Sequence, residues 1–376
     1  MKKFIILSAL LFSCIMNAQT NPAITTWLFN TTGITGRHYV TGNSTPINDA
    51  TLANVQQVRY STTYSYINAT GIPSYITGPY ALGAVSVALN NNYVFKIPLT
   101  PVPKIGTATS VGMGAIAVMI NGTVAYNNRD AATYNNAGQW HQNAVYFENL
   151  GFDCAHGHPG PMTADYHVHQ NPTAFNFSTM PTSSVCNMYL ADGLYVPNSN
   201  QHSPLIGFAA DGYPIYGAYG YTDPLDTSSA LKRITPSYRL RNITSRTTLP
   251  NGTAATGPSF TTMITSMLPN STPLPAVLGA YSEDYEFVTG IGDLDIHNGR
   301  FCKTPEYPNG IYCYFTTIDA DGNPVYPYML GDTYYGVVTN GFSHATVSGT
   351  VTTFDPSTLA TAIFNESNLE VNAYVS

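Results

Sequence analysis

The chain is poor in charged residues and in long apolar runs. Only 9% of its 376 residues are Asp, Glu, Lys or Arg, and no run of Lys or Arg occurs. This argues against nucleic acids and anionic membrane surfaces as partners, because both are bound through clustered positive charge. Beyond the N-terminal segment, no apolar run reaches the length that a helix needs to cross a bilayer. We therefore expect no transmembrane segment.

Several catalytic signatures are also missing. The sequence contains no Gly-x-Ser-x-Gly, no His-Glu-x-x-His and no glycine-rich phosphate loop. These are the usual sequence evidence for a serine hydrolase, a zinc protease and a nucleotide-binding enzyme. Any catalytic activity must therefore be argued from other residues.

Tyrosine, glycine and proline are abundant instead. The sequence has 28 Tyr, 31 Gly and 26 Pro, together with many Thr and Asn. Aromatic and β-branched residues favour strands, whereas Gly, Pro and Asn favour turns. We predict an all-β fold, a sandwich or barrel-like arrangement of several hairpins with long loops.

The first 18 residues have the pattern of an export signal. Lys2 and Lys3 precede an apolar stretch, residues 4–16, which is too short to span a bilayer, and the small residue Ala18 follows. We predict a signal peptide over residues 1–18 and a protein that is secreted, periplasmic or at the cell surface. Cys14 offers lipidation as an alternative.

The remaining chain divides by its composition into three parts. Residues 19–110 are rich in Thr, Asn, Tyr and Gly, and we predict a β-rich N-terminal region that packs on the main domain. Residues 111–340 contain the repeated motifs described below and form the predicted main domain. Residues 341–376 are polar and could form a closing strand or a tail.

Four cysteines remain in the predicted mature chain. An even number of cysteines in an exported protein indicates disulfides, and four cysteines allow three pairings. We favour the local bonds Cys154–Cys186 and Cys302–Cys313, each of which closes a modest loop. A thiolate metal site is the alternative, but the chain has no Cys-x-x-Cys.

The main domain contains a repeated turn motif. Asn121-Gly122, Asp211-Gly212 and Asp321-Gly322 each follow an apolar stretch and each precede a short segment that ends in Tyr. Asn-Gly and Asp-Gly are typical of two-residue hairpin turns. We predict three hairpins. Asp319, Asp321 and Asn323 also faintly resemble a calcium loop, but the downstream acidic ligand of an EF-hand is missing.

The segments before the second and third turns are also related. Residues 152–158 align without gaps on residues 294–300, and residues 166–169 align on residues 312–315. This indicates an internal duplication of a unit in which the first copy carries the histidines and the second has mostly lost them. Repeated turn chemistry alone would explain the Gly dipeptides, but it explains the shared order of the upstream residues less well.

The strongest chemical signal is a pair of His-x-His motifs. Nine histidines placed at random would give roughly 0.2 such pairs, yet His156/His158 and His167/His169 lie close together. In a strand, side chains two residues apart point to the same face, so His167 and His169 would present two imidazoles together. Imidazoles suit Zn and Cu. Histidines that only form hydrogen bonds in turns are the alternative.

We therefore predict a transition-metal site, with Zn or Cu as the metal. The candidate ligands are His156, His158, His167, His169 and His202. The residues expected to orient them are Asp153, Asp165, Asp211 and Tyr166. Glu148 and His141 are weaker candidates on the segment that leads to the site.

Two other functions remain open. Tyr-rich and Asn-rich faces could bind an extracellular glycan or a small molecule, which would make the protein a cell-surface or matrix module rather than an enzyme. Paired carboxylates can also hydrolyse glycosides, and an acidic cluster lies in residues 283–295. Its members are Glu283, Asp284, Glu286, Asp293 and Asp295.

At these motifs the chain resembles the YHYH family of secreted bacterial proteins. The Tyr-His-Tyr-His motif stands here as residues 166–169, with Val168 in place of the second tyrosine. The resemblance covers about residues 110–340. The other similar segments are residues 154–159, 202–217, 292–295, 298–300 and 304–308.

This resemblance implies an exported protein in which the histidines matter, and it names no reaction. The family has a cysteine where His297 stands here, which weakens the expected pairing of Cys302.

Overall fold

The computed structural model describes residues 21–40, 43, 45–80, 87–161, 163–172, 197–268 and 271–359. Strands dominate these residues and the helices are short, which confirms the predicted all-β class; none of the described sheets closes into a barrel. The predicted signal peptide, Cys14 and Cys186 lie outside the described residues. Export, lipidation and the Cys154–Cys186 bond therefore stay predictions.

The largest sheet has eight strands and carries most of the sequence motifs. Its strand order is β11-β12-β8-β7-β13-β14-β22-β21. In chain order the strands are β7 (Ala115–Met119), β8 (Val124–Tyr126), β11 (Gly157–Pro159), β12 (Tyr166–Val168), β13 (Leu205–Ala209), β14 (Pro214–Tyr216), β21 (Gly299–Cys302) and β22 (Ile311–Phe315).

Two hairpins form the centre of this sheet, and both contain a predicted Gly turn. β7 and β8 are joined at Asn121-Gly122, and β13 and β14 at Asp211-Gly212. A two-residue turn of the predicted type needs a positive φ at both central residues. Here only Gly122 and Gly212 have a positive φ, and the turns are longer than predicted. Asn121 stays out of the left-handed region because its side-chain oxygen accepts a hydrogen bond from the Thr123 amide.

The third predicted hairpin forms only as a minimal one. The turn at Asp321-Gly322 forms, with Gly322 at φ 86°, and a single antiparallel bridge between Ile318 and Pro324 flanks it in place of two strands. Asp319 accepts hydrogen bonds from the Asp321 and Asn323 amides and from the Asn323 side chain. The Asp319 carboxylate, which the sequence suggested for a calcium loop, therefore accepts its hydrogen bonds from within the turn.

The eight-stranded sheet consists of two equivalent halves. One is β7-β8 with β11-β12, and the other is β13-β14 with β21-β22. In each half a hairpin at the centre pairs in parallel with a second hairpin at the edge. The registers agree residue by residue. Matching pairs are Ala117↔Ala125 with Gly207↔Ile215, and His158↔His167 with Arg300↔Cys313.

This pairing confirms the relation of residues 152–158 to residues 294–300, and corrects the extent of the repeat. Each unit begins with its central hairpin, so the turn at Asn121-Gly122 belongs to the first unit and the turn at Asp211-Gly212 to the second.

A tyrosine–carboxylate contact recurs in both halves. The Tyr166 hydroxyl donates to the Asp153 carboxylate, and the Tyr312 hydroxyl donates to Asp295. A glycine, Gly157 or Gly299, lies directly beneath the phenol. A Cβ atom at either glycine would come within 2.3 Å of the hydroxyl oxygen. The two edge hairpins therefore depend on glycine at this position.

The other described sheets are smaller. The four-stranded sheet contains β23 (Thr352–Thr353), β3 (Val55–Tyr60), β4 (Tyr64–Ala69) and β6 (Tyr93–Pro98). The three-stranded sheet contains β2 (Ile47–Leu52), β1 (Thr35–His38) and β5 (Ile76–Thr77). The two-stranded sheets are β9 (Arg129–Thr133) with β10 (His141–Asn143), β15 (Tyr219–Tyr221) with β16 (Leu231–Arg233), β17 (Tyr238–Leu240) with β20 (Tyr285–Phe287), and β18 (Met263–Ile264) with β19 (Leu274–Pro275).

Helices are limited to single turns. The α-helical turns are α2 (Pro22–Thr25) and α3 (Ala144–Phe147), and the 3₁₀ turns are η1 (Tyr134–Asn136), η2 (Asn149–Gly151), η4 (Ser282–Asp284) and η5 (Pro356–Leu359). Within the described ranges no helix combines the length and the apolar character that crossing a membrane requires.

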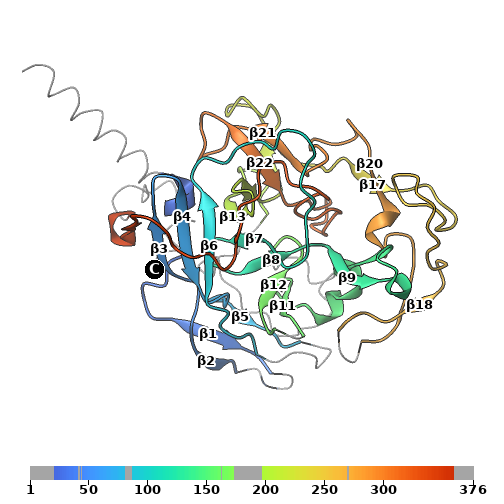
Figure 1. Ribbon diagram of the computed structural model, residues 1–376, viewed down its shortest axis with the longest axis horizontal. Helices are drawn as coiled ribbons and strands as arrows, with labels where there is room; N and C mark the ends of the chain where they lie inside the picture. Colours follow the sequence, from blue (N-terminus) through green and yellow to red (C-terminus); the bar gives the residue numbers. More distant parts are fainter. Residues whose placement is uncertain are drawn as a thin grey trace, which may run out of the picture.

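One hydrophobic core joins the four-stranded and the eight-stranded sheets. It includes Val58, Ile67, Phe95, Val118, Phe208 and Phe315. In Figure 1, β3, β4 and β6 lie beside the centre of the eight-stranded sheet, and β17, β18 and β20 lie at the far end of the molecule. Each such large apolar side chain stabilises the fold by about 1.5–3 kcal/mol when it is buried.

The predicted bond between Cys302 and Cys313 is not present, because both residues are buried free thiols. Cys302 lies opposite Ile311, and Cys313 lies opposite Arg300, so the two cysteines are diagonal neighbours on β21 and β22. Diagonal residues are about 7–8 Å apart, which is beyond the Cα separation of most disulfides. The register of the edge hairpin explains the correction.

His202 lies in the second half of the sheet, just before β13. Its ring contacts Tyr216, Tyr221 and Phe315. Nδ1 donates to the Ser203 carbonyl oxygen, and Nε2 is buried without a hydrogen-bond partner among the described residues. Burial in this apolar setting lowers the pKa of His202 to about 4.

Replacing Gly299 by alanine should destabilise the fold. The added methyl group would clash with the Tyr312 hydroxyl, and overpacking of this kind costs about 1–3 kcal/mol. Gly112→Ala is the matched control, because a Cβ atom there meets no heavy atom within 4 Å. Urea unfolding of both variants measures the difference. Equal stability of the two variants would contradict the tyrosine–glycine contact.

The stability should fall in acid partly because of His202. Its pKa in the folded state, about 4, is below the ordinary value of 6.5, so the unfolded chain binds the proton first as the pH falls from 6.5 to 4. This costs on the order of 3 kcal/mol. His202→Gln should lose correspondingly less stability over this range, and His344→Gln should behave as the unaltered protein. Urea unfolding at pH 7 and pH 4.5 tests this; identical losses in all three proteins would refute it.

Candidate metal centre

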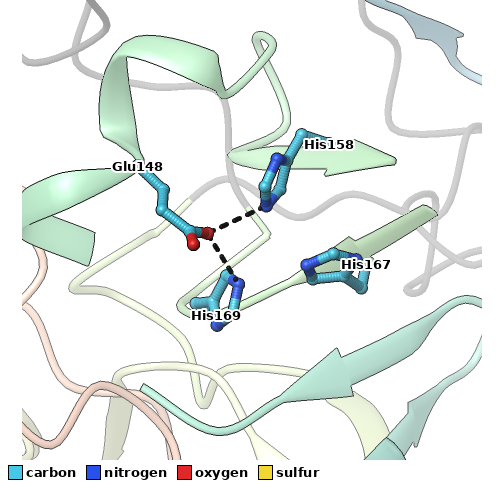
Figure 2. Close-up of side chains that lie close together, drawn as sticks. All are labelled: Glu148, His158, His167 and His169. Atoms are coloured by element: carbon cyan, nitrogen blue, oxygen red, sulfur yellow. Dashed lines mark ion pairs between the residues drawn. The ribbon is translucent and has the colours of Figure 1, made fainter. Parts of the chain in front are cut away.

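Four buried side chains converge at one edge of the eight-stranded sheet. One ligand atom from each of Glu148, His158, His167 and His169 lies within 4.8 Å of the other three, so this group could hold a metal ion. None of the four is more than 6% exposed. Figure 2 shows His158 and His169 next to the same oxygen of the Glu148 carboxylate, with His167 beside the two rings.

The β11–β12 hairpin positions the three histidines. His158 on β11 lies directly opposite His167 on β12, so both rings project from the same face of the hairpin. His169 follows two residues after His167 and shares its face, as the strand period predicts. Tyr166 and Val168 point into the protein on the other face, where they join two separate apolar clusters.

A single helical turn supplies the carboxylate. Glu148 directly follows α3, and its amide donates to the Ala144 carbonyl oxygen. The Asn143 side chain caps the start of this turn by accepting a hydrogen bond from the Val145 amide. The turn is further held by Phe147, which is buried against Tyr281. These contacts direct the Glu148 side chain at the hairpin.

Backbone carbonyl groups determine which imidazole nitrogens are free. Nδ1 of His167 lies 2.9 Å from the Asp165 carbonyl oxygen, and Nδ1 of His169 lies 2.7 Å from that of Asn127. A carbonyl oxygen can only accept, so each Nδ1 must carry the hydrogen. In the neutral imidazole, each Nε2 then presents its lone pair to the centre of the group. This is the usual way in which proteins orient histidine ligands.

The distances within the group fit metal coordination. The same Glu148 oxygen lies 3.1 Å from Nε2 of His158 and 3.3 Å from Nε2 of His169. Ligand atoms around a tetrahedral zinc ion are about 3.3 Å apart. Neither Nε2 atom makes a well-formed hydrogen bond within the part of the chain that the structure describes. Buried polar atoms of this kind normally have a partner, and a metal ion would supply one.

The charges of the group also suit a cation. Burial alone would raise the pKa of Glu148, but the imidazoles of His158 and His169 outweigh it and hold that pKa well below its ordinary value. Burial, together with the same two neighbouring histidines, lowers the pKa of His167 well below 6.5. At neutral pH the group therefore contains an ionised carboxylate and a neutral His167 imidazole, and metals bind these forms.

Aromatic rings hold two of the imidazoles in place. Tyr126 of β8 stacks on His167 with ring centroids 4.2 Å apart, and Phe152 stacks on His169 at 5.9 Å. The Tyr126 hydroxyl donates to the Asp165 carboxylate, which keeps the phenol over His167. These contacts orient the imidazoles in advance of metal binding, which lowers the entropic cost of binding.

A cavity of about 210 Å³ opens onto the four residues. Polar residues of its wall include Arg129, Asp130 and Thr163, and apolar residues include Met113 and Met267. Burial, with the neighbouring Glu148 carboxylate, raises the pKa of Asp130 to about 7. A small molecule could reach the metal position through this cavity.

Two of the predicted ligands lie outside the group. His156 is buried with φ at 62°, and its Nδ1 contacts the Asn171 carbonyl oxygen. His202 lies in the other half of the sheet, against Tyr216 and Tyr221. Neither belongs to the metal-binding group found among the described residues.

The residues expected to orient the ligands have different roles. Asp165 contacts His167, but through its backbone carbonyl group. Asp153 and Tyr166 bond to each other behind the hairpin, and burial raises the pKa of Asp153 to about 7. Asp211 accepts hydrogen bonds from the Tyr314 hydroxyl and the Gly336 amide. These last three residues stabilise the scaffold rather than the imidazoles.

The acidic cluster of residues 283–295 is dispersed over separate partners. Glu283 contacts His141, and Asp295 accepts from Tyr312. The other three carboxylates pair with cations, namely Asp284 with Arg246, Glu286 with Arg239, and Asp293 with Lys232. Each of the five carboxylates is thus engaged with a partner of its own.

Glu148 is the residue that the sequence ranked too low. It is ten residues before His158, with no regular strand or helix spacing between them. The only sequence signal is Asn143, a typical helix cap, which predicts a helical turn just before the glutamate. That Glu148 faces the hairpin depends on tertiary packing.

Among the comparisons with known proteins, a match to a protein family is the informative one. No curated protein and no solved structure matches the chain. The family model described as YHYH protein matches residues 94–329. This span includes both halves of the eight-stranded sheet and all four residues of the candidate metal centre. The chain therefore belongs to the YHYH family.

Proposed function

We propose that this protein is an exported metalloprotein that binds one Zn or Cu ion through Glu148, His158, His167 and His169. The supporting observation is the convergence of three buried imidazoles and one carboxylate within 4.8 Å. The basic and apolar N-terminal residues support export.

The ion pairs of Glu148 with His158 and His169 account for only part of this arrangement. Burying an ionised carboxylate costs several kcal/mol unless it is paired and hydrogen-bonded. Here two imidazole nitrogens approach the same Glu148 oxygen, and both lack good hydrogen-bond geometry among the described residues. A structural hydrogen-bond network would satisfy these atoms directly, whereas a metal ion would satisfy all of them at once.

The site is more accessible than a structural metal site. Structural zinc sites are closed by four protein ligands, whereas catalytic sites keep a position open to water or substrate, which here would be a fifth position beside the four side chains. The cavity of about 210 Å³ reaches all four residues. A bound metal would act as a Lewis acid for hydrolysis or, if it is copper, as an oxidant. The residues of the chain would hold the ion and exclude bulk water from one side.

The glycan-binding alternative has weaker support. An open cleft of about 430 Å³ in the N-terminal region is lined mainly by Thr, Asn and Gln side chains. Its one aromatic residue, Tyr93, is only 5% exposed and packs against Phe95 and His344. The ring therefore offers no free face on which a sugar could stack.

The metal content of the purified protein tests the proposal. After Zn and Cu have been offered, the protein should hold about one equivalent of one of them by elemental analysis. The variant His167→Ala/His169→Ala should hold less than a tenth of an equivalent, because two of its four ligands are gone. His202→Ala/His344→Ala is the control and should bind like the unaltered protein. Less than a tenth of an equivalent in the unaltered protein would refute the proposal.

Metal binding should also stabilise the fold. An ion that binds only the folded chain raises the free energy of unfolding by about 2.7 kcal/mol at a free concentration of 100 times Kd. Chelation should therefore lower the thermal midpoint of the unaltered protein and leave that of His167→Ala/His169→Ala unchanged. Calorimetry with and without the chelator measures both. A midpoint that does not respond to chelation in either protein would contradict a buried metal ligated at this site.

A further inference from the structure

The wall of the metal cavity contains one basic side chain. Arg129, the first residue of β9, is the only Lys or Arg among the residues that line the cavity. Its Nη2 atom lies 3.6 Å from the Asp332 carboxylate, beyond hydrogen-bond distance. Its Nε atom is buried and has no hydrogen-bond partner in the ranges that the structure describes. The guanidinium group is thus anchored by charge and still has donors to offer.

An arginine with free donors in the wall of a cavity is suited to an anionic ligand. A buried N–H group without a partner costs about 1–3 kcal/mol. The Arg129 side chain is 30% exposed, so part of it is accessible to a molecule in the cavity. The planar guanidinium group matches a carboxylate, which it can bind through two parallel hydrogen bonds.

The lining of the cavity also includes apolar side chains. Met113 and Met267 both line it and are 53% and 48% exposed. Pro161 and Ala131 line it as well. Thioether side chains adapt well to apolar ligands. The volume of about 210 Å³ admits a small molecule only.

From this wall we infer that the metal site takes a small monocarboxylic acid with an apolar body. The carboxylate lies between Arg129 and the metal, and the body lies against Met113 and Met267. The inference rests on the proposed function, because the carboxylate needs the metal as its second partner.

The charges of the cavity predict the order of binding. Three carboxylates line the wall, those of Asp130, Glu148 and Asp165, against the single guanidinium of Arg129, and Asp130, with a pKa of about 7, is only partly ionised at neutral pH. Without a metal these carboxylates therefore oppose the approach of an anion. A divalent ion offsets their charge and provides a binding position. The acid binds after the metal and not before it.

The test uses the full chain loaded with Co(II), whose visible absorption reports changes in its ligands. The protein is titrated with acetate, propanoate, butanoate and pentanoate. Each methylene group buried against the methionines should raise the affinity about fourfold until the cavity is full. The metal-free protein, examined by calorimetry, should bind none of the four acids.

Variants test the roles of Arg129 and of the methionines separately. Arg129→Gln should bind Co(II) as the unaltered protein does and bind butanoate at least tenfold more weakly, because a charge-assisted hydrogen bond is lost. Met267→Ala should flatten the dependence on chain length. Arg239→Gln is the matched control, since Arg239 is 57% exposed and pairs with Glu286 away from the cavity. It should behave as the unaltered protein.

The possible failures are separable. If Co(II) does not bind the unaltered protein, the proposed metal function itself fails. If Co(II) binds and the acids leave its spectrum unchanged, or if Arg129→Gln keeps full affinity for butanoate, only this inference fails. Inorganic phosphate is the competing probe, and tighter binding of phosphate than of butanoate would overturn the assignment to a carboxylic acid.

Discussion

The hydrogen bonds from the Tyr166 hydroxyl to the Asp153 carboxylate hold the hairpin on which the candidate site depends. Asp153 also accepts from the backbone amides of Ala155 and Gly157, so one buried carboxylate organises the whole entry into β11. The phenol lies directly over Gly157, which leaves no room for a side chain. This arrangement fixes the register of β11 against β12. His158 consequently lies opposite His167 rather than one residue away, where its ring would project from the other face.

The second half of the sheet shows that this scaffold and the candidate metal site are separable. Tyr312, Asp295 and Gly299 repeat the same contact on the same kind of hairpin. The positions equivalent to the three histidines are occupied by Arg300, Cys313 and Phe315. Successive residues of a strand point to opposite faces. The tyrosine of each hairpin therefore faces the carboxylate and the glycine, and the residues next to it face the candidate site or its equivalent. Ligands can therefore be exchanged without loss of the fold.

The protein has few charged side chains, and those near the candidate site compensate one another. Glu148 is balanced by imidazoles and, in the proposed function, by a metal ion. Arg129 is held by Asp332 on one side and faces the cavity on the other. Because the surroundings are buried and low in dielectric, each of these charges acts more strongly than it would at the surface. The paired carboxylates of residues 283–295 contribute to structure, as the buried Arg246–Asp284 pair shows.

The sequence by itself determined the features that depend on local periodicity. These are the all-β class, the shared face of His167 and His169, and the relation between residues 152–158 and 294–300. The length of the Gly turns was not predicted. The Asn121 side chain accepts a hydrogen bond from the amide two residues on, and this contact is compatible with several turn types. Only the tertiary structure decided that Glu148 joins the histidines, that His202 lies in the other half, and that Cys302 and Cys313 are diagonal. The physical reason is that register and the neighbours of each strand follow from burial between segments distant in the chain, which no local spacing records.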